Sequence, residues 1–227
     1  MSEAVEVLRQ FKGFSYFTEM SDIINRLEDH VASARMKTTP VIDFEKNESL
    51  KGLDYLDTIY HAIVNEHPIQ LKYRSFKARS ANSFIFYPYL LKEYRNRWFV
   101  YGVRGNGRIL QNLALDRIQS LEVLPQEHYI KNTFFDPNTF FDDLVGVTKN
   151  TGSVAEKVGF KVAAAEAPYI ITKPIHRSQQ VVERLADGSV ILEIEVVINH
   201  ELERVFFGYA EGIQVLYPKT LVELMGR

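Results

Sequence analysis

Positive charge and aromatic rings are concentrated in one stretch of the sequence, from Gln70 to Arg108. Its basic residues are Lys72, Arg74, Lys77, Arg79, Lys92, Arg95, Arg97, Arg104 and Arg108. Glu93 is its only acid, so the stretch carries a net charge of +8, while the whole chain carries −2. The rings among these cations are Tyr73, Phe76, Phe84, Phe86, Tyr87, Tyr89, Tyr94, Trp98, Phe99 and Tyr101. Because cations neutralise phosphates and flat rings stack on bases, the pattern is typical of proteins that bind single-stranded nucleic acid or nucleotides.

A second interpretation of this stretch stays open. The rings can form the core of a β-rich domain while the Lys and Arg side chains coat its outer face.

The residues from Arg97 to Arg104 are predicted to form a strand, along which side chains alternate between two faces. If the face of Trp98 is core, Arg97 and Tyr101 line a ligand surface on the other face. By residue type, the candidate ligand-binding residues are then Tyr73, Tyr89, Arg97, Tyr101, Arg104 and Arg117.

Three of these residues have an alternative role that the sequence does not decide. Tyr73 and Tyr89 can instead pack against a helix of the same domain. Arg117 follows Asp116, and the two form either an internal ion pair that locks the domain or a pair in which Asp116 aims the guanidinium at a ligand.

Catalytic and metal-binding patterns are missing from the sequence. It contains no H-E-x-x-H, no Walker loop and no G-x-S-x-G, and with no cysteine it has no thiolate ligand or nucleophile. His176, beside Arg177 and Ser178, either contacts an anion or caps a surface loop. His200-Glu201 is expected to open a helix with Asn199 as its N-cap. We therefore predict a protein that is not an enzyme and that needs neither a cofactor nor a metal.

Helical spacing of apolar residues marks the beginning of the chain. It predicts two short helices between Glu3 and Arg35 and an extended connector from Lys37 to Gly52. The pair is too small to bury its apolar face alone, which predicts packing either on a later part of the chain or on a partner chain. The sequence shows neither a secretory signal nor a membrane span, so we expect a cytoplasmic protein.

A helix and several short strands are predicted next. The helix covers Leu53 to Glu66. The strands are Ile69 to Tyr73, Ser83 to Lys92, Arg97 to Arg104, Arg108 to Ala114 and Ile118 to Leu124. Such strands behind one helix are expected to curl into a barrel that protects its edges. The aromatic stretch from Asn132 to Thr148 is expected to be a linker held on the barrel by its rings.

The last part of the chain has the order β-α-β-β-α-β of a ferredoxin-like unit. Its predicted elements are a strand at Lys157 to Val162, a helix near Ala163 to Ile170, strands at Gln179 to Leu185 and Ser189 to Ile198, a helix at Glu201 to Tyr209 and a strand at Ile213 to Leu216. The predicted class is α+β, with a helical segment at 1–51, a barrel at 52–131, a linker at 132–154 and the ferredoxin-like unit at 155–227.

The predicted barrel resembles the WYL domain of bacterial transcriptional regulators. The tripeptide that names this family appears as Trp98-Phe99-Val100, and the accompanying motifs are Ile69 to Tyr73 (I-x-L-x-Y), Pro88-Tyr89-Leu90 and Leu115-Asp116-Arg117-Ile118. The tail resembles the extension that follows WYL domains, in Pro174 to Gln179, Asp187-Gly188, Asn199 to Leu202 and Val215 to Pro218.

The resemblance implies a regulator whose Sm-like (SH3-like) WYL barrel binds an effector and controls a winged helix-turn-helix. Three departures suggest a less basic pocket, because the family often has arginine at the positions of Phe84, Gln111 and Ala114. A winged helix is missing from the sequence, so the chain is either part of a longer regulator or a sensor without that domain.

We predict that such a sensor binds a nucleotide or single-stranded nucleic acid, forms a homodimer, and reaches specific DNA only through the missing winged helix. The alternatives are an Sm-like RNA-binding protein without a transcriptional role and, least favoured, an enzyme.

Overall fold

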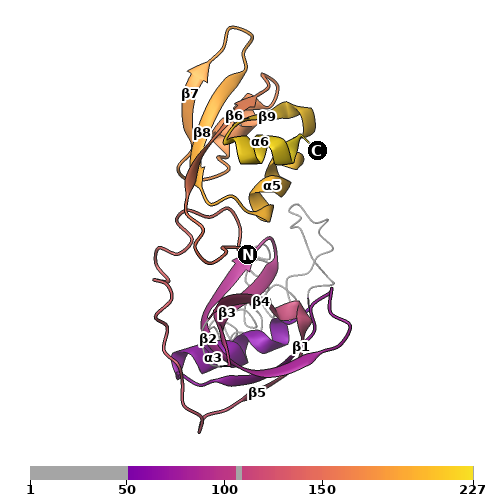
Figure 1. Ribbon diagram of the computed structural model, residues 1–227, viewed down its shortest axis with the longest axis vertical. Coiled ribbons are helices and arrows are strands. Elements are labelled where there is room, and N and C mark those ends of the chain that lie inside the picture. Colours follow the sequence, from indigo (N-terminus) through magenta and orange to yellow (C-terminus); the bar gives the residue numbers. More distant parts are fainter. Residues whose placement is uncertain (1–50, 106–108, 227) are drawn as a thin grey trace, which may run out of the picture. The chain divides into compact units, whose positions relative to one another are not determined.

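The computed structural model describes residues 51–105 and 109–226 of the chain. The helices predicted before residue 51 and the homodimer contact proposed for them lie outside the described residues. The chain divides into two compact units, with the boundary between Asn132 and Thr133 (Figure 1). No helix in the described ranges is long and apolar enough to cross a membrane.

The first unit is a helix beside an antiparallel sheet. Its elements are the 3-10 turn η2 (Leu53–Tyr55), helix α3 (Leu56–Val64), strands β1 (Ile69–Tyr73), β2 (Asn82–Tyr94), β3 (Arg97–Arg104) and β4 (Leu110–Ala114), the 3-10 turn η3 (Leu115–Arg117) and strand β5 (Ile118–Val123). The strands lie in the order β4-β3-β2-β1-β5. The helix and all five strands were predicted, and β1 and β3 have the predicted bounds.

The closed barrel expected from the sequence is not what the strand pairing shows. β4 and β5 stand at the two ends of the strand order, and the described residues contain no pairing between them. Both strands are short, and η3 takes the chain out of the sheet between them. The first unit is therefore a five-stranded antiparallel sheet.

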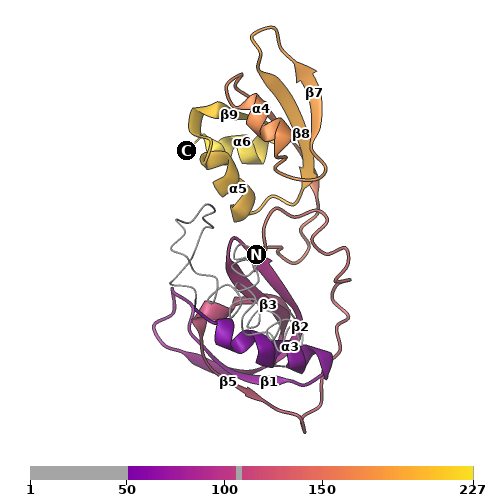
Figure 2. The same ribbon diagram turned by 180° about the vertical axis from the view of Figure 1, so that it is seen from behind.

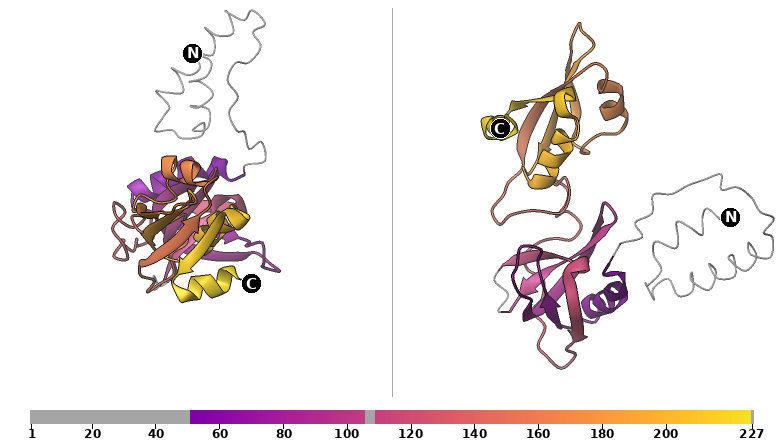
Figure 3. Two further views of the ribbon diagram at one scale, coloured as in Figure 1. Left: turned by 90° about the horizontal axis from the view of Figure 1, so that it is seen from above. Right: turned by 90° about the vertical axis from the view of Figure 1, so that its right-hand side faces the viewer.

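The core of the first unit lies between α3 and one face of this sheet. Leu56 and Ile59 are spaced to share one side of α3, and they pack with Leu71 and Phe86 from alternate positions of β1 and β2. Figure 2 and the right panel of Figure 3 show α3 lying on that face. Gly102 in β3 makes room for Phe86, because a Cβ there would lie 2.7 Å from the Phe86 ring.

The second unit has the predicted β-α-β-β-α-β order, followed by one more helix. Its elements are β6 (Glu156–Val162), α4 (Ala167–Thr172), β7 (Gln180–Arg184), β8 (Val190–Val196), α5 (His200–Phe207), the 3-10 turn η4 (Ala210–Gly212), β9 (Ile213–Tyr217) and α6 (Lys219–Met225). The strand order β7-β8-β6-β9 places β8 between β6 and β7, which is the split arrangement of ferredoxin-like units. Side chains from α4, α5 and α6 join one buried cluster with β6, β8 and β9. Helix α6 was not predicted.

The aromatic segment from Thr133 to Thr148 groups with the second unit. Val145 joins the buried cluster of that unit, and the backbone N–H of Val197 donates to the carbonyl of Asp143 at 2.8 Å. The Phe140 ring lies between Phe135 and Phe141, with centroids 4.5 and 5.0 Å away. The sequence prediction placed these rings on the first unit, because ring content shows that a segment packs but not on which surface.

Candidate ligand-binding site

One carboxylate in the first unit is shared by two arginines. The Asp116 Oδ2 atom lies 3.3 Å from Nε of Arg97, and its Oδ1 atom lies 3.8 Å from Nε of Arg117. The sheet brings them together, because Ala114 at the end of β4 pairs with Phe99 near the start of β3. Asp116 therefore emerges from η3 beside Arg97. With two guanidinium groups on one carboxylate, the cluster keeps a formal charge of +1.

Tyr73 borders this cluster from the neighbouring strands. It ends β1, where it pairs with Ile118 of β5. Burial raises the pKa of Tyr73, and this effect is opposed by the positive charge of Arg117 and by hydrogen bonds with the Ala114 backbone and the Arg117 side chain. The backbone of Arg117 is also tied to this strand, since the Arg74 N–H donates to its carbonyl at 3.1 Å. Arg117 is thus held at both its backbone and its side chain.

An aromatic ring that the sequence did not single out completes the cluster. Phe76 lies in the loop between β1 and β2, and the guanidinium of Arg117 sits over its ring, 4.5 Å from the centroid. The Phe76 side chain is 74% exposed. A loop residue has no periodicity to mark it, so only its place among cations in the sequence pointed to it.

The structure brings together three of the six predicted ligand-binding residues: Tyr73, Arg97 and Arg117. Arg104 lies at the opposite end of β3 from Arg97, a separation of roughly 23 Å for seven strand steps. There its guanidinium covers the Phe84 ring at 4.0 Å.

The remaining two predicted residues, Tyr89 and Tyr101, are buried. Tyr101 is only 2% exposed and Tyr89 only 7%. The Tyr89 ring meets Tyr129 edge-on, and burial raises the pKa of Tyr89 to about 12. Tyr101 does not lie on an open face of β3, because the middle of this strand is buried on both faces. Its role in ligand binding stays a prediction.

The pairing of Asp116 with Arg117 leaves hydrogen-bonding capacity unused. Within the described part of the chain, neither Oδ1 of Asp116 nor Nε of Arg117 has a hydrogen-bond partner. Their separation of 3.8 Å is an ion-pair distance but too long for a hydrogen bond. Both alternatives drawn from the sequence therefore keep support: the ion pair exists, and the Arg117 side chain is 27% exposed although its Nε atom is buried beside Asp116.

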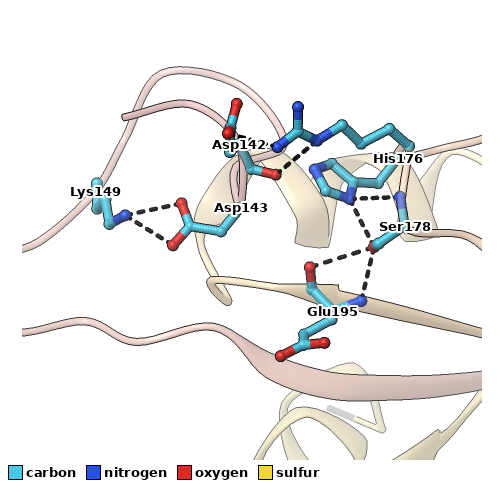
Figure 4. Close-up of polar contacts among 7 residues, drawn as sticks. Asp142, Asp143, Lys149, His176, Ser178 and Glu195 are labelled. Carbon is cyan, nitrogen blue, oxygen red and sulfur yellow. Dashed lines mark hydrogen bonds and ion pairs between the residues drawn. The ribbon is translucent and has the colours of Figure 1, made fainter. Parts of the chain in front are cut away.

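A second polar cluster, around His176 in the second unit, is built differently (Figure 4). Arg177 pairs with Asp142 at 2.7 Å, and Lys149 pairs with Asp143 at 2.8 Å. The Ser178 N–H donates to Nδ1 of His176 at 3.2 Å, and the Ser178 Oγ lies 2.7 Å from the same nitrogen. The Ser178 Oγ also accepts from the Glu195 N–H at 2.9 Å.

The cations of this second cluster, Arg177 and Lys149, are already paired with protein carboxylates. The contacts between Arg177 and Asp142 hold the segment around Asp142 against the loop before β7. Burial and the neighbouring Arg177 lower the pKa of His176, against the opposing effect of Asp142 and Asp143. Of the two roles left open for His176, the loop-capping role matches these contacts. Asn199 is confirmed as the N-cap of α5, since its side chain accepts from the Leu202 N–H at 2.9 Å.

The described residues contain no group of three or more acidic or histidine side chains placed to hold a metal ion.

Comparisons with known proteins give two family matches. Residues 54–123 match the family described as "WYL domain" and residues 155–227 match the "WCX domain", which together cover more than half of the chain. No curated protein matches the chain.

Two solved structures are similar at low identity. Proteasome accessory factor B/C (PafBC) of Arthrobacter aurescens is 15% identical with a TM-score of 0.33, over 80% of this chain and 27% of that one. A protein described as CRISPR Cas-related is 12% identical with a TM-score of 0.46, over 77% of this chain and 49% of that one. The chain thus spans about a quarter and about half of these two proteins.

Proposed function

We propose that this protein, a member of the WYL-domain family in which a WCX domain follows the WYL domain, is the effector-sensing part of a bacterial transcriptional regulator. In this proposal the WYL domain binds a phosphate-bearing ligand, a nucleotide or a single-stranded nucleic acid. The role is regulatory, without catalysis.

The observation that carries this proposal is the pair of arginines on Asp116. A guanidinium presents its N–H groups in a planar fork that matches phosphate oxygens. The side chains of Arg97 and Arg117 are 46% and 27% exposed, so both cations reach the surface of the first unit. A phosphate that binds here meets two cations, of which Asp116 neutralises only one.

Further parts of the proposal concern the whole protein. Specific DNA recognition is assigned to a winged-helix domain, so the chain by itself is expected to bind duplex DNA weakly and without sequence preference. The active protein is proposed to be a cytoplasmic homodimer, since two-fold symmetric sites are the usual targets of such regulators. We also propose that the sheet of the first unit closes into an Sm-like barrel, a closure that would require β4 and β5 to pair.

A binding titration with short oligonucleotides and nucleotides tests the ligand. Arg97→Ala and Arg117→Ala should each weaken binding and flatten its dependence on salt by about one phosphate contact, a slope change of roughly 0.7 for a single strand. Arg184→Ala, which removes an exposed arginine of β7 in the second unit, is the control and should change neither. Arg104→Ala decides whether the far end of β3 takes part.

Two results would refute the proposed ligand class. One is that no nucleotide or oligonucleotide binds more tightly than millimolar. The other is binding that both arginine substitutions in the cluster leave untouched, which would return the basic stretch to a solvated surface over an aromatic core.

A further inference from the structure

Phe76 is an aromatic side chain in an unusual position. It lies in the tight turn from Ser75 to Ala78, where the Ala78 N–H donates to the Ser75 carbonyl at 3.0 Å. Its side chain is 74% exposed, the largest exposure among the phenylalanines of the exposed apolar set. Since one ring face carries the Arg117 guanidinium, the exposed area belongs to the opposite face and the ring edge.

The guanidinium under this ring is held in place. Arg117 contacts Asp116 and Tyr73 with its side chain and accepts the Arg74 N–H with its carbonyl. A ring that rests on a fixed guanidinium loses less freedom when a second flat group stacks on it, because part of its motion is already restricted.

The charges on the same loop favour a polyanion beside the ring. Arg74, Lys77 and Arg79 are all exposed, and no acid occurs between Gln70 and Lys92. Rings flanked by cations are the arrangement with which proteins stack the bases and neutralise the phosphates of a single strand. A protein partner with an apolar surface would instead be matched by an apolar surround, which this loop does not offer.

We propose that Phe76 is the stacking platform for a nucleobase of a single-stranded nucleic acid, with Arg117 on the far face of the ring and the phosphate beside that base directed to Arg97 and Arg117. This assignment rests on the proposed function and deepens it, because it names the residue that reads a base rather than a phosphate.

The test compares two probes on the full chain. One is a short oligothymidylate, and the other is an abasic sugar-phosphate strand of the same length, which keeps the phosphates but has no base to stack. Phe76→Ala should weaken binding of the oligothymidylate about 5- to 150-fold, the range expected for one stacked base, and leave binding of the abasic strand within twofold. Phe76→Tyr should restore oligothymidylate binding.

A matched control is available in the second unit. Tyr169 in α4 is an exposed aromatic residue of similar exposure, 69%. Tyr169→Ala should leave both affinities unchanged. A 2-aminopurine placed in the oligonucleotide should lose fluorescence on binding the wild-type chain and the Phe76→Tyr variant but not the Phe76→Ala variant.

The outcomes separate this inference from the proposed function. The stacking role is overturned if Phe76→Ala leaves oligothymidylate binding unchanged, weakens both probes equally, or changes the molecular mass in light scattering, which would show that a protein surface covers the ring. If the abasic strand binds in a way that depends on Arg97 while Phe76→Ala has no effect, the function stands and the stacking role falls. If neither probe binds the wild-type chain, both fall.

Discussion

At the scale of single residues, the lowered pKa of His176 makes the stability of the second unit depend on pH. Burial and Arg177 lower its pKa below the ordinary histidine value of about 6.5. The unfolded chain therefore binds this proton more readily than the folded chain does. The stability that results is fully present above the unfolded pKa and is lost as the pH falls through that value toward the lower folded pKa.

We predict that the second unit becomes easier to unfold as the pH falls from 7 to 5, and that His176→Gln reduces this dependence. Urea unfolding followed by helical circular dichroism at several pH values measures it. Asp142 and Asp143 oppose the shift, so the variant is to be compared with the wild type at one ionic strength. Equal pH dependence of the unfolding midpoint in both proteins would contradict the role given to His176.

The candidate site was predictable in part from residue types. Arg97 was identified as a cation among rings and Arg117 by its residue type beside Asp116, and the structure places both on one carboxylate. The burial of Tyr101 was not predicted, because alternation along a strand tells which residues share a face, not whether that face is covered. Phe76 was missed as a site residue because a loop carries no periodic pattern.

At the scale of elements, two glycines in strands show how packing depends on what lies opposite. A Cβ on Gly102 would lie 2.1 Å from the backbone carbonyl oxygen of Tyr87. A Cβ on Gly159 would lie 2.1 Å from the Tyr217 ring, at the far end of a side chain that can turn away. The same substitution thus meets a fixed obstacle in one strand and a movable one in the other.

We expect Gly102→Ala to lower the free energy of unfolding by about 2 to 3 kcal/mol, because the paired strand must shift. Gly159→Ala should cost less than about 1 kcal/mol, since only Tyr217 moves. Thermal and urea denaturation of the two variants give the comparison. Equal losses would mean that the backbone of β2 yields as easily as a side chain.

Asn199 joins helix α5 to the segment that precedes the second sheet. Its Oδ1 caps the helix at Leu202, while its Nδ2 donates to the carbonyls of Val145 and Thr148, each at 2.9 Å. The side chain is buried, so the groups it leaves behind have no water to replace it.

Asn199→Ala should therefore lower the free energy of unfolding of the second unit by roughly 2 to 4 kcal/mol, through loss of the cap and of two buried hydrogen bonds. Asn199→Ser keeps a cap acceptor but loses the two donors, so an intermediate loss is expected. If the serine variant is as stable as the wild type, the bonds to Val145 and Thr148 contribute nothing measurable.

Periodicity predicted most of the elements. Alternation of apolar and polar residues predicted the bounds of β1, and the turn signals before Arg97 and after Arg104 predicted those of β3. The Asn-His-Glu pattern predicted the start of α5. Whether the first sheet closes into a barrel could not be predicted, because closure requires pairing between β4 and β5, which no local sequence pattern encodes. Helix α6 was overlooked because its seven residues after Pro218 present only Leu221 as a buried position.

At the scale of the whole molecule, the structural boundary lies well before the start of the WCX match at residue 155. The stretch from Asp142 to Thr148 is bound to the second unit through Arg177, Val197 and Asn199. By these contacts the stretch from Asp142 to Thr148 belongs to the second unit.

Limited proteolysis of the full chain should therefore yield a C-terminal fragment that begins before Asp142 rather than near Ala155. Mass spectrometry of the fragments identifies the cut. The Asn199→Ser variant should expose later sites, between Asp142 and Ser153, because the segment loses two of its bonds to the unit. A wild-type fragment that starts at Ala155 would contradict the assignment of this segment.

Trp98 makes the intrinsic fluorescence of the two units different. It is the only tryptophan of the chain and packs against the buried cluster of the first unit, next to Arg97. Its emission spectrum therefore reports the solvation of the first unit alone, while the second unit emits only through tyrosine. In a single denaturant series, tryptophan emission follows the first unit, while tyrosine emission contains contributions from both units. Coincident transitions of the two signals are expected if the units unfold cooperatively, and separate transitions if they unfold in sequence, without any label added to the chain.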